Sequence, residues 1–149
     1  MRSRGWTILI AACMLACVRQ GAAQQAAPGP QRSTLTGVFT PAQAARGKSL
    51  YGLKCRSCHT PEGHSATIKS KWAGQSLSDI FQYIAENMPK NDPGSLDAAE
   101  DAQALAYLLQ ATGMPSGSEE LPADSAALSK IRFDTLAAKP GTTAGETRP

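Results

Sequence analysis

The sequence has few aromatic residues, and beyond its first 23 residues it has no net charge and only two cysteines. Phe, Trp and Tyr make up 5% of the 149 residues, which is little for a chain that builds a dense core from its own side chains. The formal charge of +3 comes from three arginines within residues 1–23, since residues 24–149 hold 12 basic and 12 acidic residues. Binding of a polyanion needs clustered positive charge, so nucleic acid is excluded as the main partner.

Residues 1–23 have the three parts of an export signal. Arg2 and Arg4 supply a positive start, and an uncharged apolar run of 13 residues follows at 6–18. Small residues precede the cleavage point that we predict after Ala23. A membrane-spanning helix needs about 20 apolar residues, so a retained membrane anchor is disfavoured and the mature protein is expected in the bacterial periplasm.

A lipid anchor is an alternative fate for the N-terminus. The sequence Ile-Ala-Ala-Cys, which ends at Cys13, is similar to a bacterial lipidation site. In that case the protein would be held on the periplasmic side of a membrane. If Cys13 is not lipidated, it serves as a small apolar residue of the signal.

The two cysteines that remain, Cys55 and Cys58, are separated by two residues and followed directly by His59. This C-x-x-C-H pattern is the attachment signal for c-type haem. Two thiols one helical turn apart can each add to a vinyl group on the same porphyrin edge. The histidine then lies beneath the iron as an axial ligand. We therefore predict one covalently attached haem c, with its iron, per chain.

Two other interpretations of these cysteines are weaker. A thioredoxin-like redox pair follows a strand, and the residues before Cys55 have no strand pattern. A zinc site would draw Cys55, Cys58, His59 and His64 from only ten residues. Structural zinc sites take a second ligand pair from farther along the chain, and ligation by the adjacent Cys58 and His59 would strain the backbone.

Hydrophobic periodicity and capping residues predict an all-α domain with three main helices, over residues 41–51, 77–87 and 98–109. The second of these has apolar residues at the spacing of one buried helix face. Residues 60–71 show no clear period and are expected to wrap the haem edge. No strand pair is predicted.

The second axial position of the iron has several candidates: Met88, Met114, His64, or no ligand. His64 is too close in sequence to His59 to reach the opposite face of a porphyrin, and Met114 is explained as an apolar contact at a helix end. Met88 lies 29 residues after His59 and precedes Pro89, which stiffens its loop. Thioether ligation accompanies histidine in electron-carrying cytochromes, so we favour His59 and Met88 as the iron ligands.

Together these motifs resemble the class I c-type cytochromes of bacteria, above all the small monohaem domains associated with quinoprotein alcohol dehydrogenases. The resemblance covers residues 40–115 and is carried by 45–51, 55–59, 72–74, 77–81, 88–96 and 106–109. It implies that Met88 is the distal ligand and that the first and last helices cross at Gly47 and Tyr51. In many relatives a proline carbonyl orients the haem histidine. Pro61 is the only proline between His59 and Trp72. The resemblance therefore does not identify the group that orients His59.

The predicted organisation is a signal peptide (1–23), a flexible leader (24–39), a cytochrome c domain (40–115), a C-terminal extension that packs on it (116–138) and a disordered tail (139–149). The predicted function is electron transfer, without catalysis, between a dehydrogenase donor and an oxidase or other cytochrome of the respiratory chain. The protein would act as a monomer or as a subunit of a complex. The alternatives are a cytochrome subunit bound permanently to a quinoprotein dehydrogenase, and a haem sensor or enzyme with an open iron site.

Charge is distributed unevenly within the neutral part of the chain. Residues 46–71 carry six basic residues against one acidic residue, and residues 79–101 carry six acidic residues against one basic residue. This pattern predicts a basic side next to the haem motif that docks an acidic redox partner. The alternative is that the basic and the acidic segments form two ordinary solvated surfaces that dock no partner.

Overall fold

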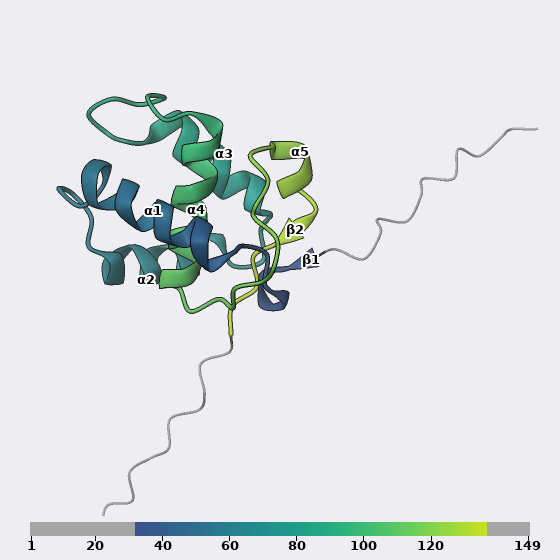
Figure 1. Ribbon diagram of the computed structural model, residues 1–149. Coiled ribbons are helices and arrows are strands. Elements are labelled where there is room, and N and C mark those ends of the chain that lie inside the picture. Colours follow the sequence, from purple (N-terminus) through teal and green to yellow (C-terminus); the bar gives the residue numbers. More distant parts are fainter. Residues whose placement is uncertain (1–31, 137–149) are drawn as a thin grey trace, which may run out of the picture.

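The computed structural model describes residues 32–136, which form five α-helices and a pair of very short strands (Figure 1). The predicted signal peptide, the first part of the leader and the predicted tail lie outside the described residues. In chain order the elements are β1 (Arg32–Ser33), the 3₁₀ helix η1 (Thr34–Thr36), α1 (Pro41–Lys54), α2 (Pro61–Trp72), α3 (Leu77–Asn87), α4 (Ala98–Ala111), α5 (Ser125–Leu128) and β2 (Ile131–Arg132). The predicted all-α fold class is confirmed, and the three predicted helices correspond to α1, α3 and α4. No helix within residues 32–136 combines the length and the apolar character that a bilayer crossing requires.

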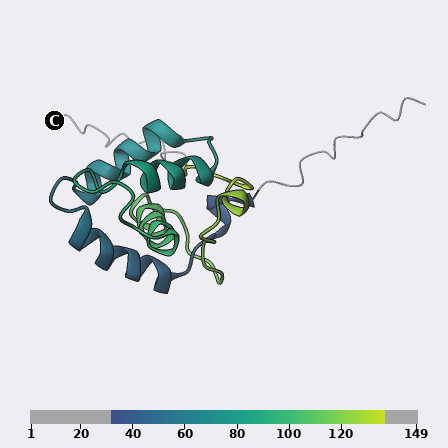
Figure 2. The same cartoon turned by 90° about the horizontal axis from the view of Figure 1, so that it is seen from above.

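Helix α4 lies at the centre of the domain, with α1 on one side and α2 and α3 on the other (Figure 2). Helix α1 begins at Pro41, where the Thr40 hydroxyl accepts a hydrogen bond from the Gln43 N–H at 3.0 Å. Gly47 allows α1 to approach α4 closely, because a Cβ atom there would lie 1.9 Å from the carbonyl oxygen of Gln103. The two helices thus cross at Gly47, as the family resemblance implied.

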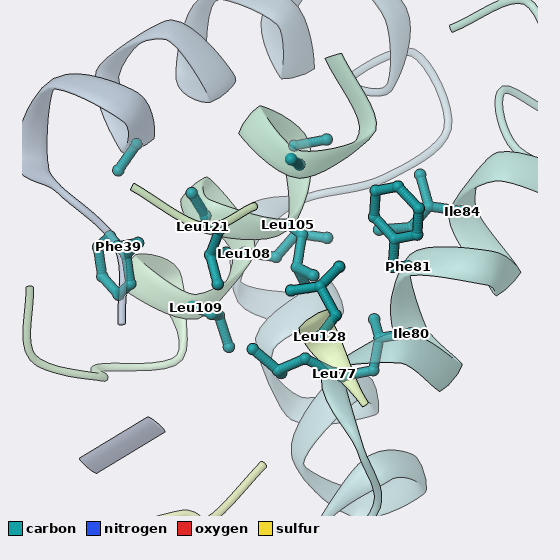
Figure 3. Close-up of a cluster of buried hydrophobic side chains, with 14 of the residues drawn as sticks. Phe39, Leu77, Ile80, Phe81, Ile84, Leu105, Leu108, Leu109, Leu121 and Leu128 are labelled. Atoms are coloured by element: carbon teal, nitrogen blue, oxygen red, sulfur yellow. The ribbon is translucent and has the colours of Figure 1, made fainter. Parts of the chain in front are cut away.

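Helices α3 and α4 each begin with a capping box, which explains why their starts are visible in the sequence. Ser76 and Asp79 cap α3, and Asp97 and Glu100 cap α4, each pair with reciprocal side chain–backbone hydrogen bonds. The apolar face of α3 packs into the core together with leucines of α4 (Figure 3). Helix α3 ends at Asn87, so that Met88 follows directly as its C-terminal cap.

Residues 60–71, which are not among the three predicted helices, form most of the additional helix α2. Thr60 caps the helix by accepting a hydrogen bond from the Gly63 N–H at 3.2 Å, and Pro61 occupies its first position. Ile68 is the one hydrophobic residue of α2 that is fully buried. Much of the inner face of α2 lines a cavity instead of packing against the core. The sequence of α2 therefore lacks the regular spacing of apolar residues that marks a core-facing helix.

The prediction of a flexible leader over residues 24–39 is wrong for residues 32–39, which pack onto the domain. Val38 and Phe39 are fully buried, and β1 pairs in parallel with β2 from the C-terminal segment. The same pairing corrects the expectation that no strand pair would form. Each strand has two residues, which is too short for an alternating pattern to show.

The C-terminal extension also covers the core. Leu128, Ile131 and Phe133 are buried with the helices, so this segment packs on the domain. The buried side chain of Gln43 ties the extension to α1, because its amide donates to the Leu121 carbonyl at 2.9 Å and accepts from the Leu121 N–H at 2.8 Å. The extension therefore holds the entry to α1 in place.

Candidate haem site

The C-x-x-C-H motif lies in the turn that ends α1. Cys55 is the C-terminal cap of the helix, and its N–H donates to the Tyr51 carbonyl at 3.0 Å. The N–H groups of Cys58 and His59 both donate to the Cys55 carbonyl, at 3.1 and 3.0 Å. Neither cysteine forms a disulfide, and burial raises the pKa of the Cys55 thiol. The turn therefore places two thiols and an imidazole within one tight stretch of backbone.

An apolar cavity of about 410 Å³ opens beside this turn. His59 and Met88 both line it, together with apolar side chains of α2, α3 and α4, namely Ile68, Ile80, Ile84 and Leu108. A second cavity of about 40 Å³ shares His59 and Met88 and is lined in addition by Cys55. Small-molecule and cofactor sites typically measure about 300–1,000 Å³, so the larger cavity has the size of a cofactor site.

The structure separates the two methionine candidates. Met88 caps α3, with its N–H donating to the Ile84 carbonyl at 2.9 Å, and its side chain is partly buried against the core. Met114 is 4% exposed within the core and does not line either cavity. Its N–H donates to the Leu109 carbonyl at the end of α4. Of the two methionines, Met88 is the one whose sulfur can act as a ligand to a group bound beside His59.

His64 lies next to His59, although the sequence favoured it neither as a zinc ligand nor as the second iron ligand. The two imidazole rings are stacked, with centroids 3.8 Å apart and an interplanar angle of 20°. The hydroxyl of Tyr51 lies 3.2 Å from Nδ1 of His64. Burial, and secondarily the nearby charge of His59, lowers the pKa of His64 to about 4. Burial is also the main cause that raises the pKa of Tyr51 to about 12. Both groups are therefore neutral at pH 7.

The far part of the larger cavity carries a cation and two aromatic rings. The Lys71 ammonium lies 4.7 Å from the centroid of the Trp72 ring and 4.1 Å from that of the Tyr83 ring. All three side chains line the cavity, and the two rings are 5.5 Å apart. Trp72 belongs to the sequence motif 72–74, but the sequence does not indicate that Lys71 and Tyr83 lie beside it, because their proximity depends on how α2 and α3 pack.

The zinc and thioredoxin-like alternatives lack structural support. Within residues 32–136 no group of three or more His, Cys, Asp and Glu side chains is arranged to hold a metal ion. Cys55 follows a helix, whereas a thioredoxin-like pair would follow a strand.

The residues present do fit a haem group. Thiols for the vinyl groups lie at the cavity, an imidazole nitrogen and a thioether sulfur line it, and its walls are apolar. Lys71 offers a cation for the haem carboxylates. When bound, haem supplies an iron that alternates between Fe(II) and Fe(III).

Helices packed around such a cavity, with C-x-x-C-H at its edge, define a cytochrome c-like domain. Comparison with known families agrees, since residues 42–108 match the family described as cytochrome c oxidase, cbb3-type, subunit III. The described residues therefore form a cytochrome c-like domain, which is similar to that family over residues 42–108. This class of domain binds haem c covalently and acts in electron transfer.

The chain is also similar to a curated protein of a respiratory complex. Over 84 residues the chain is 34% identical to the cytochrome bc1 complex cytochrome c subunit of Corynebacterium diphtheriae. The aligned part covers 51% of this chain and 30% of that protein, so the chain spans less than a third of the relative's length. No solved structure matches the chain.

Proposed function

We propose that this protein is an electron carrier of the bacterial periplasm, with one haem c bound through Cys55 and Cys58 and with His59 and Met88 as iron ligands. The observation that carries the proposal is that His59 and Met88 line one apolar cavity at the C-x-x-C-H turn. His59 and Met88 would hold the iron between them and leave no open site for a substrate, so the bound haem would supply one-electron transfer. A neutral thioether also favours Fe(II) and raises the reduction potential.

The test of this proposal is a denaturing gel of the exported full-length chain, stained for haem peroxidase activity. We expect colour at the mature mass, and we expect the Cys55→Ser, Cys58→Ser double variant to lose it because no thiol can then hold the haem. Ser57→Ala, within the same motif, is the matched control and should stain like the wild type. An unstained wild-type band would contradict the proposal.

The proposed partners are a dehydrogenase as electron donor and an oxidase or another cytochrome as acceptor. Similarity to a cytochrome c subunit of a respiratory complex supports a place in a respiratory chain. The alternative is a subunit held permanently on a quinoprotein dehydrogenase, which would co-purify with a large subunit, whereas a carrier would elute as a free monomer. Fractionation distinguishes a soluble periplasmic form from one anchored at Cys13.

The proposed docking surface consists of Leu53, Lys54 and Arg56, at the end of α1 beside the haem cysteines. All three are exposed, Leu53 by 83%, and Lys54 lines the smaller cavity. Arg46, at the other end of the basic segment, is paired with Glu120 at 2.6 Å. Lys54 and Arg56 form no ion pair within the described residues, so the positive charge beside Cys55 is uncompensated, which favours an acidic partner.

Lys54→Glu is expected to slow the oxidation of the reduced protein by the anion ferricyanide several-fold at low salt. The reason is that the substitution replaces attraction by repulsion next to the haem site. Stopped-flow absorbance measures the rate, and added salt should reduce the difference because it screens exposed charges. Lys130→Glu, the same charge change on the exposed turn before β2, should have a much smaller effect. Wild-type rates that do not fall with salt would contradict this docking surface.

A further inference from the structure

The closest aromatic partner of His59 is the ring of His64. The ring centroids are 3.8 Å apart and the planes differ by 20°, so one face of the His59 imidazole is covered by a second flat ring. Among residues 32–136, no protein group forms a hydrogen bond with a ring nitrogen of His59. The stack on His64 is therefore the aromatic contact that can restrain the orientation of this imidazole.

His64 is itself held from two directions. Its backbone N–H donates to the Thr60 carbonyl at 3.0 Å in the first turn of α2. Its Nδ1 lies 3.2 Å from the hydroxyl of Tyr51. Tyr51 is a buried residue, with 2% of its surface exposed. The Tyr51 ring packs against Tyr107 with centroids 5.1 Å apart, and this contact belongs to the crossing of α1 and α4. The His64 ring is thus tied through Tyr51 to the crossing of α1 and α4.

We propose that His64 is a positioning residue that fixes the rotation of the His59 imidazole about its Cβ–Cγ bond, with Tyr51 as its anchor. The inference rests on the proposed function, because it assigns to His59 the role of iron ligand. Groups that orient a ligating histidine tune the metal that the histidine holds. Here the orienting group is a stacked ring on α2 in place of a carbonyl. A flat neighbour at stacking distance resists rotation of the imidazole out of its plane.

The test is the electron paramagnetic resonance spectrum of the oxidised, haem-loaded full-length chain, whose principal g values depend on the plane of the axial imidazole. His64→Ala and His64→Leu should shift and broaden the largest g value, because each removes the flat ring and leucine keeps the volume. His64→Phe should restore the wild-type spectrum, since it restores a ring. Tyr51→Phe should shift the spectrum in the same direction as His64→Ala but by less.

Ser65→Ala, at the adjacent position on α2, is the matched control and should leave the g values unchanged. A His64→Leu spectrum identical to that of the wild type, in position and width, would overturn the inference, as would a His64→Phe spectrum that stays with the leucine variant. If the His64→Ala protein does not accumulate, comparison of the largest g value between His64→Leu and His64→Phe still tests the inference. Failure of the proposed function is separate, because it would appear in the wild type as missing covalent haem or a missing thioether–iron band.

Discussion

Replacing Met88 with alanine is expected to open the iron of the haem-loaded protein. The oxidised variant should lose the thioether–iron charge-transfer band, and the reduced variant should bind carbon monoxide rapidly, whereas the wild type does not. The reduction potential should fall by on the order of 0.1 V, within the roughly 0.8 V over which axial ligands set haem potentials. Absorbance spectra and a spectroelectrochemical titration measure these changes. The physical reason is the loss of a neutral sulfur ligand that favours Fe(II).

Met114→Ala is the matched control, since it removes the same side chain from a site that does not line either cavity. Met114 is buried in the core, so this variant should lose about 2–5 kcal/mol of stability but keep the charge-transfer band and the potential. The two variants are thus expected to separate ligation from packing. If the band survived in Met88→Ala, the assignment of Met88 would be wrong. Rapid carbon monoxide binding by the wild type would favour a sensor or enzyme with an open iron site.

The features that sequence reasoning predicted are those determined by residues close together in the chain. The capping boxes of α3 and α4 each lie within four residues, and the apolar spacing of α3 identifies its buried face. The C-x-x-C-H motif is contiguous, so its chemistry is visible without any fold. The close approach at Gly47 needed the family resemblance, because a glycine alone does not tell which helix it faces.

The features that sequence reasoning missed depend on distant contacts. Ser33 donates to the carboxylate of Asp134 at 2.6 Å across 101 positions, and such a contact leaves no local pattern around β1. Helix α2 was missed because its inner face serves a cavity and thus lacks an amphipathic stripe. The stack of His64 on His59, and the hydrogen bond between Tyr51 and His64, arise only once α1 and α2 are folded around the C-x-x-C-H turn.

Gly47→Ala is expected to destabilise the protein strongly, although alanine is the better helix former. The added Cβ would lie 1.9 Å from the Gln103 carbonyl oxygen and 2.9 Å from Cβ of Tyr107. Backbone cannot yield as a flexible side chain can, so α1 and α4 must separate. Overpacking costs about 1–3 kcal/mol and occasionally more. We expect a loss of about 3 kcal/mol here, after a gain of about 1 kcal/mol in helix propensity.

Gly52→Ala offers a matched control in the same helix, because a Cβ atom at Gly52 would meet nothing within 4 Å. This variant should gain up to about 1 kcal/mol, so the two substitutions are expected to shift the thermal midpoint in opposite directions. Calorimetry of the haem-loaded proteins measures both shifts. Gly47→Ala should also disturb the haem site, since separation of α1 from α4 moves Tyr51 away from Tyr107 and loosens the anchor of His64. Equal midpoints for the two variants would contradict the close approach of α1 to the Gln103 carbonyl at Gly47.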